Sequence, residues 1–388
     1  MSEVVNIPQL RFPGFSGEWK DKRFDSLYPT VRNGFVGVAT PYYVEEGVPY
    51  LQGKNIKSGA INRNGLVYIN ESFHQKSKKS QLRQNDIVMV QSGHVGECAV
   101  ITEEFEDTNC HALLVSTPTH DIDSKFYINY FYSKFGRKKI YRITTGNTIK
   151  HILSSDLKIQ TVSNPSYQEQ QKIAAFLAAV DSKIEQLSKK QELLKEYKKG
   201  LMQQIFSQVT RFKADDGCDF PDWEEKKLGD VSVRGTSNIS ANQLEDNNGD
   251  YKIYGAAGHL KNIDFYTEED CYVAIVKDGA GVGRIMLLES KTSVLGTLAI
   301  IKAKQGNDIN FLYWLIQTIN FRKYVVGSTI PHIYYRDYQA EKLRIPSLSE
   351  QAKIASFLSS IDNKIEQVGK QLVESKQFKK ALLQQMFV

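Results

Sequence analysis

The glycine-rich stretch 278–284 is the part of the chain whose residue types come nearest to cofactor chemistry. Glycine loops let a backbone approach phosphate closely, as in dinucleotide and methyl-donor sites. However, the full Rossmann spacing is missing, and no convincing strand–helix–strand unit surrounds the stretch. The better interpretation is a tight turn, or a close approach of the backbone to DNA.

A second segment with chemical potential is Asn164-Pro165-Ser166-Tyr167, which looks like the base-binding Asn-Pro-Pro-Tyr loop of adenine methyltransferases. A repeated copy of this region, described below, reads Ile345-Pro346-Ser347-Leu348 instead. Because only the Pro-Ser pair is repeated, the segment is interpreted as a helix cap and not as a catalytic loop.

The chain offers little else for catalysis or metal binding. Cys98 and the Cys110-His111 pair lack a second pair of ligands, so buried thiols are the better interpretation. No Walker loop, nuclease carboxylate cluster or Ser/His/Asp arrangement stands out. We therefore expect no catalytic site, no metal and no cofactor bound by this chain.

The bulk composition predicts a soluble protein of two or more domains. The chain has 388 residues, 41% of them hydrophobic, a mean hydropathy of −0.39 and a net charge of +6. Residues 1–13 contain no apolar run, so we expect neither a signal peptide nor a membrane anchor. Four scattered cysteines suit reduced thiols, which predicts a cytoplasmic location. The mildly basic charge is compatible with nucleic acid but is weak support alone.

A segment of about 40 residues occurs twice, at 165–206 and 346–387, with about half of its positions identical. Each copy begins with a proline and a predicted capping box, Ser166 with Glu169 and Ser347 with Glu350. Apolar residues then recur at steps of four and three, which is typical of a coiled coil. Each copy is therefore predicted to form one helix about 60 Å long. The predicted pairing residues are Ile173, Leu177, Val180, Ile184, Leu187, Leu194, Leu201, Ile354, Leu358, Ile361, Ile365, Val368, Leu372 and Leu382.

Polar residues interrupt both stripes, at Gln191 and Lys198 in the first copy and at Ser375 and Lys379 in the second. They are either solvated edges of the seam or residues that fix register and partner. We favour solvated edges for the lysines, and both interpretations stay open for Gln191.

Chain connectivity predicts the direction of the helices. The segment between them starts at the end of one helix and finishes at the start of the other. A compact domain with neighbouring termini allows this only if the two helices are antiparallel. Val388 should then lie near the start of the first domain.

The two intervening regions, 1–163 and 208–344, are weakly alike. Both begin with a Phe-Pro pair and a tryptophan, Phe12-Pro13 with Trp19 and Phe220-Pro221 with Trp223. Both have a glycine-rich turn after an apolar strand, a short late aromatic helix, and a Gly-x-Thr-Ile or Gly-Ser-Thr-Ile segment ending in His-Ile. Short β-branched and aromatic runs predominate. The sequence thus predicts an α+β fold with two globular domains of mostly antiparallel sheet, 1–163 and 208–344, and long helices within 164–207 and 345–388.

The order domain, helix, domain, helix resembles the specificity subunit of type I restriction-modification systems. The motif that carries the resemblance is Pro-Ser-x-x-Glu-Gln-x-Lys-Ile-Ala-x-Phe-Leu followed by Asp-x-Lys-Ile-Glu-Gln, in 165–186 and again in 346–367. The resemblance spans the whole chain.

It implies a non-catalytic subunit of a bacterial or archaeal complex. Each globular domain would be a target recognition domain that reads one half of an asymmetric, bipartite double-stranded DNA site. The helix pair would set the spacing and dock two modification subunits, which are adenine N6 methyltransferases. S-adenosylmethionine, ATP and Mg²⁺ would bind to those subunits and to the restriction/translocase subunits.

Recognition domains vary across the family, so DNA contacts are nominated from residue type and loop position alone. Lys and Arg suit phosphates, whereas Asn, Gln and some Arg can read base edges. In the first domain the candidates are Lys54, Asn55, Arg63, Asn64, Gln91, Ser92, His94, Arg137, Lys138, Lys139, Thr144, Asn147, Thr148, Lys150 and His151. In the second they are Arg234, Thr236, Asn238, Lys277, Arg322, Lys323, Ser328, Thr329, His332, Tyr334, Tyr335 and Arg336.

Two other classes of function compete with this one. A fused methyltransferase or nuclease would transfer methyl groups or cut DNA without a partner. A coiled-coil scaffold would assemble without any DNA sequence preference.

Overall fold

The computed structural model describes residues 6–388, which divide into two compact units. The first unit contains the chain up to Ser188 together with Lys370–Val388, and the second contains Lys189–Gly369. Each unit therefore holds one globular domain and one portion of each long helix. No helix among residues 6–388 is long and apolar enough to cross a membrane.

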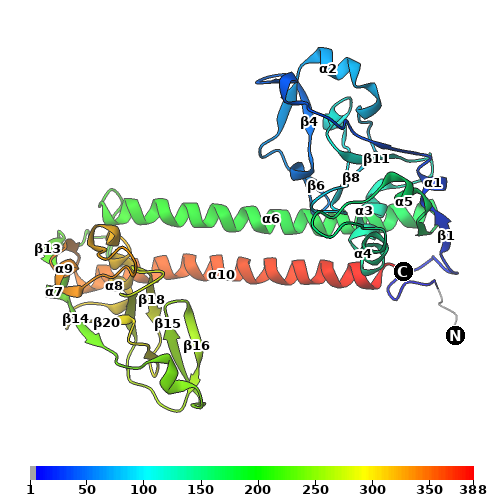
Figure 1. Cartoon of the computed structure of the whole chain (residues 1–388). Coiled ribbons are helices and arrows are strands. Elements are labelled where there is room, and N and C mark those ends of the chain that lie inside the picture. Colours follow the sequence, from blue (N-terminus) through cyan, green and yellow to red (C-terminus); the bar gives the residue numbers. More distant parts are fainter. Residues whose placement is uncertain (1–5) are drawn as a thin grey trace. The chain divides into compact units, whose positions relative to one another are not determined.

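The first unit is built on a four-stranded antiparallel sheet in the order β2-β11-β8-β9, of which β8 and β11 are labelled in Figure 1. A second, mixed sheet has the order β10-β4-β7-β3. The unit also contains two separate antiparallel strand pairs, β1 with β12 and β5 with β6. Its strands are β1 Lys20–Arg23, β2 Thr30–Asn33, β3 Tyr43–Val44, β4 Val48–Leu51, β5 Ile56–Lys57, β6 Ala60–Ile61, β7 Val67–Ile69, β8 Ile87–Val90, β9 Cys98–Val100, β10 Asn109–Cys110, β11 Leu113–Thr117 and β12 Thr161–Asn164. Its short helices are α1 Phe24–Leu27, α2 Glu71–Lys76, α3 Ser124–Tyr132, α4 Lys134–Arg142 and α5 Ser154–Ile159.

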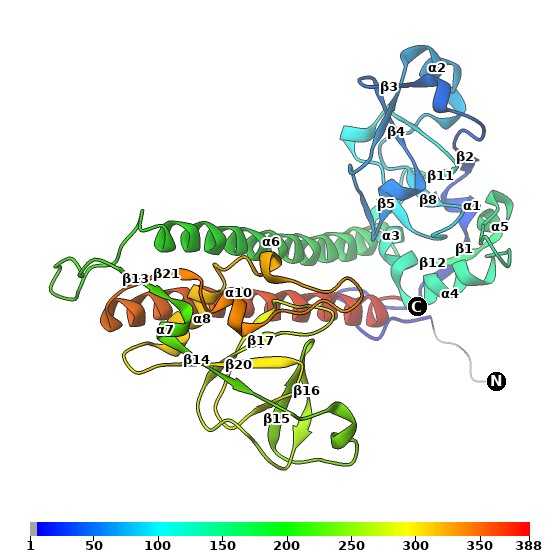
Figure 2. The same cartoon turned by 60° about the vertical axis from the view of Figure 1, so that its left-hand side comes forward.

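The second unit repeats the principal sheet in the order β14-β20-β17-β18, again fully antiparallel; β14, β20 and β17 are labelled in Figure 2. A three-stranded sheet, β16-β15-β19, and the pair β13 with β21 accompany it. Its strands are β13 Glu224–Lys227, β14 Ser232–Thr236, β15 Tyr251–Gly255, β16 Gly258–Ile263, β17 Tyr272–Val276, β18 Ile285–Leu288, β19 Ser293–Val294, β20 Leu298–Ala303 and β21 Lys342–Ile345. Its short helices are α7 Leu228–Val231, α8 Ile309–Ile316 and α9 Tyr335–Tyr338. The mostly antiparallel α+β prediction is confirmed.

The repeated segments form α6, Tyr167–Phe206, and α10, Leu348–Gln385. In the first unit, Ile173 and Leu177 of α6 share a core with Leu382 of α10. In the second unit, Ile205 near the end of α6 shares a core with Ile354 and Leu358 near the start of α10. In each unit the early turns of one helix thus meet the late turns of the other, which confirms the antiparallel prediction. Every predicted pairing residue is buried or half-buried.

The two lysines that interrupt the apolar stripes are not solvated edges, and that prediction is wrong. Within the first unit, Lys379 of α10 donates to Asp181 of α6 at 2.6 Å. Within the second, Lys198 of α6 lies 2.6 Å from Asp362 of α10 and 4.4 Å from the centre of the Trp314 ring. The repeat supplies one Asp and one Lys to each helix, so both ion pairs cross the seam in the same way. Because opposite charges face each other at defined positions along the two helices, they oppose a shift of one helix along the other.

The cap of each long helix also differs from the prediction in one respect. The Ser166 and Ser347 hydroxyls accept from the backbone N–H of Glu169 and Glu350, as expected. The glutamate carboxylates, however, are buried and do not complete a capping box. Glu169 instead accepts two hydrogen bonds from Arg11, at 2.7 and 2.8 Å, and Glu350 accepts from Arg211 at 2.9 Å.

This arginine belongs to a short motif that leads into each domain. Arg11 is followed by Phe12, whose ring packs edge-on against Phe176, and Arg211 by Phe212, whose ring packs edge-on against Phe357. The structural counterpart of Phe12 is therefore Phe212, and not the phenylalanine of the second Phe-Pro pair. The arginine and phenylalanine together fasten the entrance of each domain to the first turns of its long helix.

The end of the chain is fastened to the first domain, as predicted. The Leu10 N–H donates to the carbonyl of Gln385, and the Ser163 hydroxyl donates to the carbonyl of Val388 at 2.9 Å. The ring of Phe387 lies against Trp19 and Phe126 in the first core. The last turn of α10 is thus part of the first domain.

Candidate nucleic-acid interface

A groove of about 1030 Å³ in the first unit gathers seven of the predicted DNA contacts. It lies between the glycine-rich turn after β8, the turn after β4 together with strand β5, helix α4 and the loop after that helix. The predicted residues that line it are Lys54, Ser92, His94, Arg137, Lys138, Thr144 and Lys150. A concave surface with several cations suits a polyanionic ligand.

Two glycines allow the walls of this groove to approach each other. Gly96 has a φ of +82°, and a Cβ there would lie 2.7 Å from the side chain of Ile140 in α4. Gly146 has a φ of +94°, and a Cβ there would lie 2.2 Å from the carbonyl oxygen of Ile149. A side chain at either position would therefore push α4 away or open the loop.

The loop 145–151 is docked on the end of the central strand β8. The Gly93 N–H donates to the carbonyl of Lys150, and the Ile152 N–H donates to the carbonyl of Gln91. Thr145 and His151 exchange both backbone hydrogen bonds and so close the loop. This places Asn147 and Thr148, both exposed, at its tip, with His151 at its base.

The second unit builds the same arrangement from its own residues. The Gly279 N–H donates to the carbonyl of Pro331, the Ile333 N–H donates to the carbonyl of Lys277, and Val326 and His332 close the loop. Gly327 has a φ of +88°, and a Cβ there would lie 2.5 Å from the carbonyl oxygen of Ile330. The exposed Ser328 and Thr329 are therefore counterparts of the loop-tip residues in the first unit.

Other candidates of the second unit lie around this loop or on the edge strand. Tyr334 and Arg336 stack on each other, 4.9 Å from guanidinium carbon to ring centre. Lys323 is paired with Glu341 at 2.7 Å, and Lys277 with Asp278 at 3.2 Å. The remaining exposed candidates are Arg322 beside the loop and, from the edge strand β14 onward, Arg234, Thr236 and Asn238.

Four candidates are buried or half-buried, and so are less open to a ligand than the loop tips. Asn55 is fully buried, and its side chain accepts from the N–H of Gln52 and donates to the carbonyls of Asn62 and Asn64. Lys139 donates to the carbonyl of Thr161, and Tyr335 contacts Ser232 through its hydroxyl. The side-chain oxygen of Gln91 is buried without a hydrogen-bond partner among residues 6–388. Of these four, Asn55 shapes its loop from within, so its polarity misled the sequence interpretation.

Arg63 and Asn64 are not among the residues that line the groove. Arg63 forms an ion pair with Glu104 and lies over the Phe105 ring. The groove instead contains Lys57, Glu97 and Tyr141, which were not nominated from the sequence. The sequence offered little reason to nominate Glu97, because it lies one residue beyond the glycine-rich turn and its negative charge does not suit DNA.

Arg284 was also missed in the second unit. It occupies the position equivalent to Glu97, directly before a strand, because its carbonyl accepts from the Val276 N–H as that of Glu97 accepts from the Val90 N–H. Its guanidinium donates to the carbonyl of Ala256 at 2.6 Å. Its place directly after the glycine cluster was the available signal.

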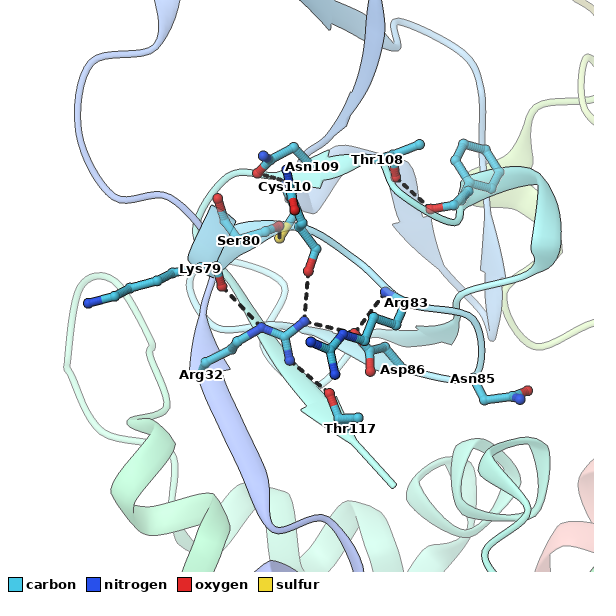
Figure 3. Close-up of polar contacts among 12 residues, drawn as sticks. Arg32, Lys79, Ser80, Arg83, Asn85, Asp86, Thr108, Asn109, Cys110 and Thr117 are labelled. Atoms are coloured by element: carbon cyan, nitrogen blue, oxygen red, sulfur yellow. Dashed lines mark hydrogen bonds and ion pairs between the residues drawn. The ribbon is translucent and has the colours of Figure 1, made fainter. Parts of the chain in front are cut away.

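Not every cation near the sheet belongs to the interface. Arg32 of β2 donates to Asp86 at 2.9 Å, to the Thr117 hydroxyl at 2.8 Å and to the Lys79 carbonyl at 3.1 Å (Figure 3). Asp86 is fully buried. This network ties two strands to the segment that precedes β8, and we assign it to stability.

Two of the four cysteines are buried, as the sequence predicted. Cys98 and Cys110 are buried, and burial raises the pKa of the Cys110 thiol to about 12. Desolvation also lowers the pKa of His111. Among residues 6–388, no group of three or more His, Cys, Asp or Glu side chains is placed to hold a metal ion.

Comparison with known proteins gives one consistent family. The family model described as the type I restriction modification DNA specificity domain matches residues 17–196 and again 221–375. The predicted MjaX specificity subunit of a type I restriction enzyme from Methanocaldococcus jannaschii is 24% identical over 98% of this chain and 94% of its own length. The MjaVIII specificity subunit from the same organism is 24% identical over 94% and 91%.

A solved structure supports the fold. The S subunit of a type I restriction-modification system from M. genitalium aligns with a TM-score of 0.68 and 18% identity, covering 98% of this chain and 99% of that one. The two matches to the family model each span one globular domain and most of the long helix that follows it.

Proposed function

This chain belongs to the family of type I restriction modification DNA specificity domains, and from that premise we propose that it is the DNA-addressing subunit of a type I restriction-modification complex. Each unit binds one half of a bipartite double-stranded DNA site through its glycine-rich turn and docked loop. The groove of the first unit carries the proposal, because it brings together seven residues nominated as DNA contacts.

The proposal leaves chemistry to partner subunits. Two modification subunits bind S-adenosylmethionine and methylate adenine, and restriction subunits use ATP and Mg²⁺ to translocate and cleave DNA. The paired helices α6 and α10 set the distance between the half-sites and offer the modification subunits a docking surface. The two loops differ in sequence, Asn147-Thr148 against Ser328-Thr329, which supports unlike half-sites.

Methylation mapping tests the proposal. The chain is co-expressed with its modification subunits in cells lacking other adenine methylation, and the modified positions are sequenced. We expect one asymmetric motif of two specified parts separated by unspecified bases. Methylation without a sequence preference would favour a structural scaffold, and methyl transfer by the purified chain alone would favour a fused enzyme.

The assignment of loops to half-sites has its own test. The double variant Thr329→Ala/His332→Ala alters one loop of the second unit. We expect one half of the motif to relax while the other half keeps its sequence. Loss of protein stability with both halves unchanged would contradict the contact assignment.

A further inference from the structure

The groove of the first unit contains an arginine that is held from two sides. The Arg137 Nη2 donates to Oε1 of Glu97 at 2.9 Å, and its guanidinium carbon lies 4.4 Å from the centre of the Tyr132 ring. Arginine loses much rotamer freedom when it binds a ligand. Here a carboxylate and an aromatic face have already removed much of that freedom.

Glu97 is itself held in place. Its Oε2 accepts from the Ser58 N–H at 2.6 Å and from the Tyr132 hydroxyl at 2.8 Å. Burial opposes ionisation of this carboxyl, but the Ser58 N–H, Arg137 and the Tyr132 hydroxyl together hold the pKa of Glu97 below its ordinary value. The carboxylate is therefore ionised at neutral pH, fixed to the backbone and able to anchor Arg137.

The remaining edge of the guanidinium is open to a ligand of opposite charge. Nε and Nη1 of Arg137 have no hydrogen-bond partner within residues 6–388, and the side chain is 40% exposed. The other cations that line the groove, Lys54, Lys57, Lys138 and Lys150, are all exposed. A fixed, planar fork among exposed ammonium groups matches the tetrahedral oxygens of a phosphodiester.

We propose that Arg137 binds a backbone phosphate of DNA in this groove and that Glu97 is the residue that positions it. The proposal rests on the proposed function, since it requires that the first unit binds DNA. In this proposal, this part of the groove contributes affinity for DNA and fixes the position of the domain along it. The loop tip reads the bases. It also explains why an acidic side chain lines a surface that is otherwise basic.

The expected effect of Glu97 on DNA binding is opposite to the effect expected from its charge alone. A carboxylate near a phosphate repels it, so removal of that charge alone should strengthen DNA binding. If Glu97 instead acts by holding Arg137, the Glu97→Gln variant should weaken binding, because the guanidinium loses its ionic anchor. The two explanations predict opposite directions.

The experiment uses the full chain assembled with its modification subunits. Binding of duplex DNA, with and without the mapped site, is measured over a range of salt concentrations for wild type, Arg137→Met, Glu97→Gln and the double variant. For Arg137→Met we expect about tenfold weaker binding on both DNAs and a salt slope smaller by about 0.9. For Glu97→Gln we expect weaker binding in the wild-type background and no further loss in the Arg137→Met background.

Glu104→Gln is the matched control, because Glu104 lies in the same unit, pairs with Arg63 and does not line the groove. It should leave binding unchanged or slightly stronger. Three results would overturn the proposal: stronger binding by Glu97→Gln, an equal effect of Glu97→Gln with and without Arg137, or a changed methylation motif with an unchanged salt slope in Arg137→Met. A wild-type complex without site preference contradicts the proposed function instead, since the salt slope is measured on any DNA.

Discussion

Replacing Arg11 by methionine should selectively unfold the first unit. Arg11 makes two hydrogen bonds of 2.7 and 2.8 Å to Glu169, whose side chain is only 2% exposed. Methionine keeps most of the apolar volume but leaves the carboxylate buried without its cation. Breaking a buried pair in this way costs about 3–5 kcal/mol. For a unit of about 200 residues, this lowers Tm by about 6–20 °C.

Arg211→Met is the matched variant of the second unit, and its effect should be smaller. Arg211 is 25% exposed, and Glu350 would keep the hydrogen bond from the Trp223 indole N–H at 3.0 Å. We expect a loss of about 2–3 kcal/mol, because one donor to the carboxylate remains and Arg211 is less buried than Arg11.

Calorimetry combined with hydrogen exchange of peptides from each unit measures both effects. Arg11→Met should expose peptides of the first unit, and Arg211→Met those of the second. Adding Glu169→Gln to Arg11→Met should recover most of the lost stability, because a neutral amide leaves no unpaired charge buried. The reasoning fails if Arg11→Met costs less than Arg211→Met, or if the double variant is no more stable than the single one.

Three further predictions address the seam, the loop and the thiols. Lys198→Asp should destabilise the second unit by about 1–2 kcal/mol, because it places a second carboxylate against Asp362. The exchanged pair Lys198→Asp/Asp362→Lys should regain most of the lost stability, as measured by urea unfolding. Equal stability of the single and exchanged variants would contradict a pairing role. Gly327→Ala should weaken DNA binding by the assembled complex and leave hydrogen exchange in the first unit unchanged. The reason is that φ at Gly327 is +88° and a Cβ there would lie 2.5 Å from a carbonyl oxygen of the same loop. DNA binding equal to that of the wild type would show that the loop is not used. Because burial raises the pKa of Cys110 to about 12, its thiol should stay protonated and unlabelled by iodoacetamide at pH values well below that, whereas the exposed Cys218 reacts; mass spectrometry of labelled peptides decides.

The long helices were predictable because their signal is local and repeated. A heptad stripe without internal proline determines a helix wherever it packs, and two copies determine two helices. Their antiparallel direction followed from connectivity alone. The ion pairs of Lys198 and Lys379 were missed because each joins residues that are far apart in sequence, and only the folded register brings them together.

The candidate interface was predictable as loops but not as individual side chains. Glycines at 96 and 146 marked tight turns, and the structure uses both for close approach. Whether a polar side chain in such a loop points outward depends on non-local partners. Asn55 turns inward to three backbone groups, whereas Glu97, which sequence reasoning passed over, faces the groove.

The first unit is built from two distant stretches of chain, and this has a consequence for synthesis. Its core includes Leu382, Met386 and Phe387, which are synthesised after the whole of the second unit. The second unit is continuous from Lys189 to Gly369 and can close its core earlier. At translation rates of about 5–20 residues per second, the first domain waits about 10–40 s for its final turn of helix. The first domain is therefore completed after the second, and a nascent chain that ends between Gly369 and Leu382 would carry a finished second domain and an open first one.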